Sequence, residues 1–214
     1  MSKVPFALRS FDAQSGGKRR VLEERYGADE AAALLAEARN YFEHLLPTLP
    51  NEGSFRYLMD GFFMAAIELL AYGKVLRNHG ATPDEIGRFI DEVSVMPLER
   101  WPKLRAWIGR AFIGLMVWRL PNSAKAFIDD PETATFQFSV VDEPKASFAM
   151  DVTDCGICRV AHREGMSDLM PFICALDDKQ SDAMELRLER SGTIGTGATH
   201  CDFRYKKPVT PPED

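Results

Sequence analysis

The stretch that decides the fold is residues 136–152, FQFSVVDEPKASFAMDV, where the hydrophobic pattern changes its period. Phe136 and Phe138 alternate with polar residues, and the same alternation returns at Phe148 and Met150. Successive side chains of a β-strand point to opposite faces, so a period of two indicates a strand that is buried on one side. The segment between the two runs contains Asp, Glu and Pro, which favour a turn. The sequence therefore predicts an antiparallel hairpin.

Upstream of the hairpin, residues 18–128 have a helical period instead. A first helix is expected over residues 29–46, which are rich in Ala, Leu and Glu. It ends before Pro47, because the residue before a proline is pushed out of the α region. A second helix is expected to begin at a Ser54 cap and to close at Gly80, with apolar residues at three- and four-residue spacing.

Two further helices follow in the sequence. Thr82 opens the segment TPDE, a capping box with proline at the first helical position. The apolar stripe of residues 98–121 predicts a fourth helix, which Pro121 is expected to end. All three tryptophans, Trp101, Trp107 and Trp118, lie on this helix. A stripe of such large side chains is typical of a protein core or a subunit interface, so a homo-oligomer is compatible with the sequence.

Downstream of the hairpin, two short helices are expected at about residues 155–164 and 168–180. Strand alternation resumes over residues 184–188 and again over residues 201–205. The predicted fold class is therefore α+β. In this fold an N-terminal helical half packs on a C-terminal four-stranded antiparallel sheet, which carries two short helices on one face.

The same patterns suggest a domain organisation. Residues 1–17 contain proline, serine and glycine that interrupt any apolar period, and they are expected to form a flexible leader. Residues 18–206 are expected to form one α+β domain, with a helical part over 18–128 and a sheet part carrying the site over 132–206. Residues 207–214 are rich in proline and are expected to be a disordered tail.

Composition narrows the possible partners. The 214 residues are 45% hydrophobic and carry a net charge of −6. An acidic chain is a poor ligand for phosphate backbones, so no nucleic-acid partner is expected. The longest apolar run, residues 111–118, is far shorter than the roughly 20 residues that span a bilayer, and no membrane partner is expected. The N-terminal residues lack the pattern of a secretory signal, which favours a cytoplasmic protein with reduced cysteines.

A few charged residues in the helical half need an interpretation. Asp60 and Glu68 lie in the apolar second helix. A buried unpaired carboxylate is unfavourable, so exposure on the polar side of the helix is favoured over a place in a pocket. The basic cluster of residues 18–20 is expected to be the solvated start of a helix.

All four cysteines lie in the strand-rich half of the chain. Cys155 follows Thr153 and Asp154, either of which can cap a helix, so its thiol is expected in a first helical turn. There the helix dipole favours a thiolate and lowers the pKa, which makes Cys155 the best candidate nucleophile. Cys201 shares a strand face with Phe203 and is expected to point inward.

The cysteines also allow a metal site. Cys155, Cys158 and His162 fall on one helical face, and the four cysteines together would supply the four ligands of a zinc ion. The spacing is not the paired Cys-x-x-Cys pattern of a zinc ribbon. A zinc site at Cys155, Cys174 and Cys201 therefore stays an open alternative, beside buried and chemically inert cysteines.

From Asp151 onward the order of residues resembles the L-2-amino-thiazoline-4-carboxylic acid hydrolase family. The Cys-Asp-Phe-Arg ending is the most specific part of this resemblance. The matching positions are Asp154, Cys155, Gly165, Leu169, Phe172, Ile173, Cys174, Asp177, Arg190, Thr193, Ile194, Gly197, Cys201, Asp202, Phe203, Arg204 and Tyr205.

The resemblance implies a hydrolase that opens a cyclic amidine, 2-aminothiazoline-4-carboxylate or a similar small molecule, with water or a cysteine thiolate attacking the ring carbon. It would make Cys155 the nucleophile or a metal ligand, Cys174 and Cys201 its partners, and Asp177 a general base or ligand. Arg190 or Arg204 would hold the substrate carboxylate. Asp202 is a further substrate-binding candidate, although it points away from Cys201 on the strand, which equally suits structural pairing with a nearby arginine.

Other functions remain open at this stage. A ligand-binding or sensory domain similar to the 4-vinyl reductase group, with a structural cysteine and zinc site, is the main alternative to the hydrolase. A thiol redox protein ranks last, because Cys155 and Cys158 lack the strand and helix surroundings of a thioredoxin-like motif. The glycine-rich segment 191–197 leads into a strand, so it is interpreted as a turn between strands and not as a phosphate-binding loop.

Overall fold

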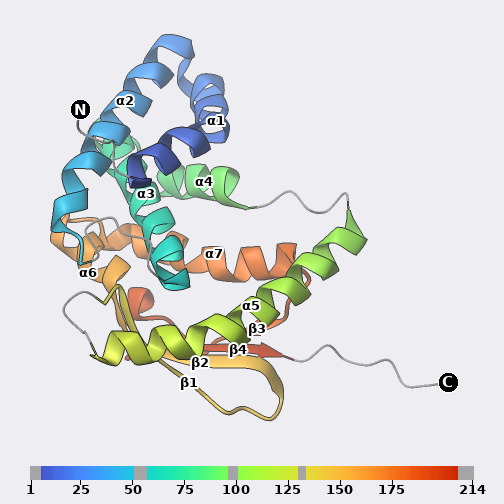
Figure 1. Ribbon diagram of the computed structural model, residues 1–214. Coiled ribbons are helices and arrows are strands. Elements are labelled where there is room, and N and C mark those ends of the chain that lie inside the picture. Colours follow the sequence, from blue (N-terminus) through green and yellow to red (C-terminus); the bar gives the residue numbers. More distant parts are fainter. Residues whose placement is uncertain (1–5, 51–56, 96–100, 130–133, 207–214) are drawn as a thin grey trace.

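A computed structural model describes residues 6–50, 57–95, 101–129 and 134–206. Figure 1 shows the N-terminal helices above, the sheet below, and α7 between them. The helices are α1 (Phe6–Tyr26), α2 (Ala28–Leu45), α3 (Leu58–Asn78), α4 (Pro83–Ser94), α5 (Pro102–Asp129), α6 (Gly156–Arg163) and α7 (Met170–Ala183). Within the described ranges, none of them combines the length and hydropathy that a membrane-crossing segment needs.

The sheet has the predicted antiparallel architecture. Its strands are β1 (Phe136–Val140), β2 (Ala146–Cys155), β3 (Leu188–Glu189) and β4 (Cys201–Lys206), in the order β1-β2-β4-β3. Each pair of neighbours is antiparallel, and Met150 of β2 lies opposite Phe203 of β4. The apolar side chains of β2 and β4 share the buried face of the sheet, so the α+β prediction is confirmed.

The strand predicted over residues 184–188 is shorter than expected. Of the predicted strand residues, only Leu188 belongs to β3, because Leu186 is hydrogen-bonded to the C-terminal end of α7. The backbone N–H of Leu186 donates to the carbonyl of Ser181 at 2.8 Å, which closes the helix instead of extending the sheet.

The four helices predicted for the N-terminal half are present. α4 begins at the predicted capping box, where the Thr82 side chain accepts a hydrogen bond from the backbone N–H of Glu85 and the Glu85 carboxylate accepts one from the backbone N–H of Thr82. α3 begins at Leu58 with Tyr57 as its N-cap, and the predicted Ser54 cap lies outside the described residues.

The flexible leader predicted for residues 1–17 is wrong from residue 6 onward. α1 begins at Phe6 and runs through both glycines of the segment, because its apolar side chains pack on neighbouring helices. Phe11 is 2% exposed and stacks on Tyr72 of α3, with ring centroids 5.3 Å apart. Burial of large side chains therefore outweighs the weak helix propensity of this segment.

The predicted end of the fourth helix at Pro121 is also wrong. α5 continues through Pro121 to Asp129. A proline inside a helix costs about 3 kcal/mol, and packing of the following turns offsets that cost. Phe127 of these turns lies edge-on to Phe138 of β1, with centroids 6.0 Å apart.

The tryptophans of this region are not in the core. Trp101, Trp107 and Trp118 are 56%, 60% and 65% exposed in the single chain, so the core interpretation of their stripe is wrong. The opposite side of α5 is the one that packs, through residues such as Met116 and Leu120. Whether the exposed side is a subunit interface stays a prediction.

Asp60 and Glu68 are buried, against the expectation of solvent exposure. Asp60 is 2% exposed, and Glu68 is 4% exposed. Both are partnered, which offsets the penalty of burying a carboxylate. Asp60 accepts hydrogen bonds from the backbone N–H of Tyr57 at 2.9 Å and from the Thr135 hydroxyl at 3.0 Å.

The docking of α5 can be tested with two glycines of the same helix. A Cβ on Gly109 would clash with the carbonyl oxygen of Met184, whereas a Cβ on Gly114 would meet no atom within 4 Å. We expect Gly109→Ala to lower the free energy of unfolding by about 1–3 kcal/mol through overpacking. Gly114→Ala should raise it by up to about 1 kcal/mol through helix propensity. Denaturant unfolding measures both, and equal stability of the two variants would contradict the packing described.

Candidate functional site

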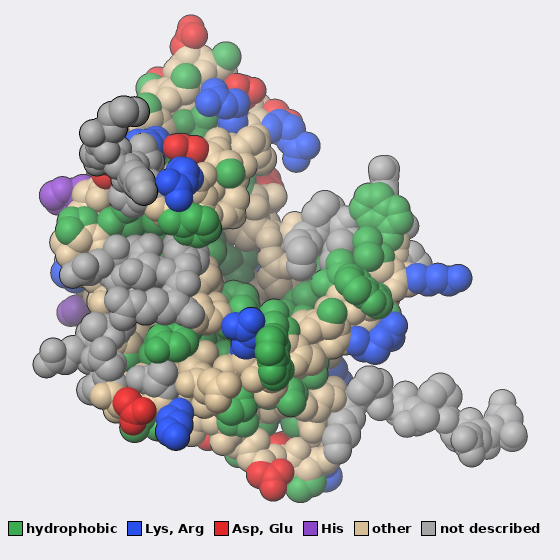
Figure 2. Space-filling view, in the orientation of Figure 1, with side chains coloured by type: hydrophobic (Ala, Val, Ile, Leu, Met, Phe, Trp, Pro, Cys, Tyr) green, Lys and Arg blue, Asp and Glu red, His purple; other side chains and the backbone are tan. Residues whose placement is uncertain are grey.

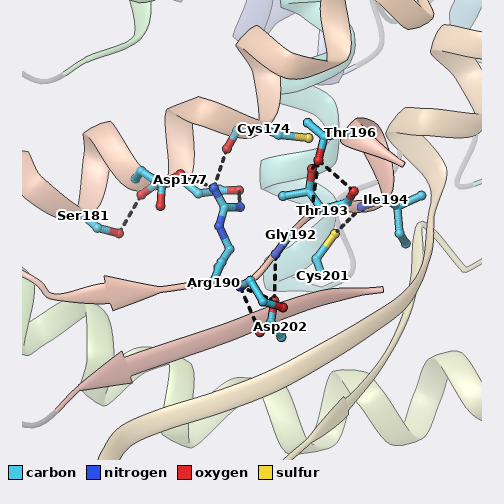
Figure 3. Close-up of polar contacts among 12 residues, drawn as sticks. Cys174, Asp177, Ser181, Arg190, Gly192, Thr193, Ile194, Thr196, Cys201 and Asp202 are labelled. Carbon is cyan, nitrogen blue, oxygen red and sulfur yellow. Dashed lines mark hydrogen bonds and ion pairs between the residues drawn. The ribbon is translucent and has the colours of Figure 1, made fainter. Parts of the chain in front are cut away.

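One cavity of about 510 Å³ lies between the sheet and the helices that cover it. Cys155, Cys174, Cys201 and Asp177 all line it, although they come from β2, α7 and β4. Arg190, which follows β3, lines it too. These five residues line one cavity, and Figure 3 shows Cys174, Asp177, Arg190 and Cys201 between α7 and the sheet.

Cys155 is positioned by the junction of a strand and a helix. It is the last residue of β2 and the N-cap residue of α6. The next residue, Gly156, donates its backbone N–H to the Thr135 carbonyl at 2.9 Å. A Cβ on Gly156 would clash with that carbonyl oxygen, so only glycine lets the chain turn this closely after Cys155.

Cys174 and Cys201 are positioned by the loop between β3 and β4. A Cβ on Gly195 would lie 2.7 Å from the Cys174 sulfur, so glycine allows this loop to reach α7. The backbone N–H of Ile194 donates to the Cys201 sulfur at 3.2 Å. The glycine-rich segment is thus an inter-strand turn, as predicted, and it orients two of the three thiols in the cavity (Figure 3).

The thiols of the cavity are held in their neutral form. Three effects raise the pKa of Cys155: a side-chain hydrogen bond with Cys158, burial, and the electrostatic effect of Cys158. Burial raises the pKa of Cys174 to about 11, and it also raises the pKa of Cys201. The thiolate predicted at Cys155 is therefore wrong, because desolvation and a neighbouring thiol outweigh the helix terminus.

Asp177 and Arg190 form the charged centre of the site. The Arg190 guanidinium donates to Asp177 Oδ2 at 2.9 Å and to the Cys174 carbonyl at 2.9 Å, and it also contacts the carboxylate of Asp178. Its side chain is 6% exposed. Burial raises the pKa of Asp177 to about 6, against the opposing charge of Arg190. A carboxyl group with this pKa can exchange a proton near neutral pH.

Two predicted substrate-binding residues lie elsewhere. Asp202 accepts hydrogen bonds from the backbone N–H groups of Ser191 and Gly192, so it holds the turn after β3 (Figure 3). Arg204 pairs with Asp151 of β2 at 2.7 Å. Neither residue lines the cavity, because alternate β4 residues point to the opposite face of the sheet. Their predicted contact with substrate is corrected accordingly.

Residues 101–205, about half of the chain, match the model of a family described as L-2-amino-thiazoline-4-carboxylic acid hydrolase. This part of the chain belongs to that family. No curated protein and no solved structure matches the chain. The matched segment begins at the start of α5 and includes every predicted site residue.

The zinc site that the cysteines allow is a further expectation for this segment. Among the residues that the structure describes, no group of three or more His, Cys, Asp or Glu side chains lies close enough to hold a metal ion. Cys158 and His162, the other members of the predicted helical face, do not line the cavity. His200 contacts the hydroxyl of Thr199 at 3.1 Å and is also outside the cavity.

The sequence did not predict the residues that α1 and α3 add to the cavity. Lys18 and Glu68 line it, 2.7 Å apart, with side chains 9% and 6% exposed. Burial raises the pKa of Glu68, and the ammonium group of Lys18 opposes this shift. In the sequence, the signal for this ion pair is a carboxylate within a very apolar helix. The sequence does not identify its partner, because the basic cluster of residues 18–20 is also typical of a solvated helix start.

The thiol protonation can be tested by alkylation. We expect the rate of iodoacetamide modification of Cys174 in the folded protein to rise about tenfold per pH unit, up to a pH near 11. Mass spectrometry of the labelled peptides gives this rate, and the denatured protein is the control with an ordinary pKa of about 8.5. Limited access of the reagent to the thiol would lower the alkylation rate at every pH without moving the midpoint of the pH dependence. A Cys174 rate that levels off near pH 8.5 in the folded protein would exclude the raised pKa.

Proposed function

We propose that the cavity hydrolyses a small cyclic amidine of the 2-aminothiazoline type. The observation that carries this proposal is the convergence of Cys155, Cys174, Cys201 and Asp177 on one cavity from three separate elements. The family description supports the same class of substrate. The site has what a ring-opening hydrolysis needs: enclosed space, a carboxyl group that titrates near neutral pH, and polar groups around it.

Asp177 is the general base in this mechanism. Its carboxylate takes a proton from water, and the hydroxyl oxygen bonds to the ring carbon between sulfur and nitrogen. Asp177 passes this proton to the ring nitrogen as the carbon becomes tetrahedral. The carboxylate then takes the proton of the new hydroxyl group, a carbonyl group forms, the carbon–sulfur bond breaks, and Asp177 delivers this second proton to the sulfur. One water is consumed, and the product is a urea with a free thiol.

Arg190 is a positioning residue in this proposal. Its guanidinium donates two hydrogen bonds to α7, one to the Asp177 carboxylate and one to the Cys174 carbonyl. These bonds hold the Asp177 carboxylate at the cavity. Its charge also opposes the effect of burial on the Asp177 pKa. Without that charge the pKa would rise further, and Asp177 would stay protonated over more of the physiological range.

The neutral thiols favour water over cysteine as the attacking group. A thiol attacks as its thiolate, and the raised pKa values of Cys155 and Cys174 leave little thiolate at neutral pH. The thiols instead give the cavity soft, weakly polar walls beside the departing sulfur. Attack by Cys155 is the alternative route, and its replacement by serine would then abolish turnover.

A ligand-binding domain is the second candidate function, because most residues lining the cavity are apolar. Turnover separates the two functions. A binding domain would hold a cyclic amidine without releasing a thiol, whereas the hydrolase releases one thiol for each ring opened.

Asp177→Asn tests the hydrolase directly. We expect a loss of about 10²–10⁴ in kcat/KM, because the amide cannot accept the proton from water. In the unchanged protein, kcat/KM should fall as the pH drops through about 6, because Asp177 must be ionised to act as the base. Release of thiol from 2-aminothiazoline compounds, followed with a chromogenic thiol reagent, measures both effects.

Asp182→Asn is the matched control. Asp182 lies on the same helix but outside the cavity. We expect its activity and pH profile to equal those of the unchanged protein. A profile of the unchanged protein that is flat between pH values of about 5 and 8 would remove Asp177 from the role of base.

A further inference from the structure

We propose that the substrate has a neutral or cationic amidine head joined to a large apolar body, and that it carries no carboxylate. This inference rests on the proposed function, which it deepens by naming the substrate class. It is carried by the charges that line the cavity, by the volume of the cavity, and by the helices that form its apolar wall.

Within the described part of the chain, the cavity offers no free positive charge to an anionic ligand. Among the described residues that line it, the charged side chains are Lys18, Glu68, Asp177 and Arg190. They form two ion pairs, Lys18 with Glu68 at 2.7 Å and Arg190 with Asp177 at 2.9 Å. A ligand carboxylate would have to displace a protein carboxylate from one of these pairs, which would leave that carboxylate without its partner.

Arg190 is especially unsuited to hold a ligand carboxylate. Two protein carboxylates, those of Asp177 and Asp178, already contact it, together with the Cys174 carbonyl. Its guanidinium also lies over the ring of Phe203, 5.0 Å from the centroid. One cation with two carboxylates leaves a net negative centre. A planar amidinium group suits such a centre, because it can donate two parallel hydrogen bonds to a carboxylate.

The volume of the cavity points to a ligand much larger than one small ring. Pockets of about 300–1,000 Å³ typically hold drug-sized ligands, and this cavity measures about 510 Å³. Figure 2 shows the surface hollowed between α5 and the N-terminal helices, with hydrophobic side chains in the hollow. The apolar residues that line the cavity include Met59, Phe62, Ala66, Leu69, Phe112 and Met116.

Part of the apolar wall lies outside the segment that carries the charged centre. Asp177 and Arg190 lie in the segment that matches the hydrolase family. Met59, Ala66 and Leu69 belong to α3, which precedes that segment. The reacting head would therefore meet residues of the family segment, while the apolar body would pack on α3, outside that segment, and on α5, inside it.

Binding of four compounds tests the substrate class. Isothermal titration would compare 2-aminothiazoline, its 4-carboxylate, and 2-aminothiazolines with a butyl or an octyl group on the exocyclic nitrogen. We expect the 4-carboxylate to bind at least about tenfold more weakly than 2-aminothiazoline, because it meets the negative centre. Affinity should rise roughly fourfold per methylene along the alkyl series, as each group leaves water.

Two variants locate the apolar body. Ala66 is 7% exposed and lines the cavity, so Ala66→Phe should remove most of the gain from the octyl group while 2-aminothiazoline still binds. Phe112→Ala removes part of the wall and enlarges the cavity, so the lost contacts should reduce the same gain about tenfold. This variant serves if Ala66→Phe does not fold. Ala32→Phe is the matched control, because Ala32 is exposed on α2 and lies outside the cavity.

The outcomes separate this inference from the proposed function. Turnover of the 4-carboxylate, combined with no gain from alkyl groups, would overturn the inference and leave the hydrolase intact. Chain-dependent binding that Ala66→Phe or Phe112→Ala reduces, without any turnover, would overturn the hydrolase and leave an apolar ligand site. Chain-dependent binding that neither variant changes would overturn the inference, because the compounds would then bind elsewhere.

Discussion

The guanidinium of Arg190 joins the parts of the site that are far apart in the sequence. It follows β3, and its hydrogen bonds reach Asp177 and the Cys174 carbonyl on α7. A buried cation is stable only when its donors are satisfied, so the sheet edge and the helix must keep one relative position. That position closes one side of the cavity and sets the direction of the Asp177 carboxylate. Loss of the cation would leave two neighbouring carboxylates, of Asp177 and Asp178, without a counter-charge.

Close backbone contacts complete the arrangement that Arg190 begins. Gly156 lets β2 turn directly into α6 at Cys155, and Gly195 lets the last loop touch the sulfur of Cys174. Both contacts place a thiol against protein atoms and away from bulk water, which is why these thiols stay protonated. The geometry that gathers the cysteines is thus the same geometry that suppresses their nucleophilic form, and it leaves Asp177 as the group able to move a proton.

The sequence predicted the features that depend on local pattern. The hairpin at Phe136 and Phe148 and the capping box at Thr82 are both present, because strand alternation and capping need only neighbouring residues. The inward direction of Cys201 follows from the same alternation. The sequence could not predict features decided by distant packing. α1 is helical because Phe11 packs on Tyr72 of α3. α5 continues beyond Pro121 because Phe127 packs on Phe138 of β1. The thiol pKa at Cys155 and the partner of Glu68 depend on burial, which no local pattern encodes.

The position of Lys18 gives the first segment of the chain a structural role. From the sequence alone this segment would be removed as dispensable, because its glycines suggest a flexible terminus. Yet Lys18 comes from α1 and neutralises Glu68 in the middle of the apolar helix α3. Removing the chain up to and including this lysine would leave the buried Glu68 carboxylate at the cavity without its partner and would remove Phe11, which stacks on Tyr72. An N-terminally shortened protein would therefore be a poor choice for crystallisation or for screening, however disordered its sequence looks.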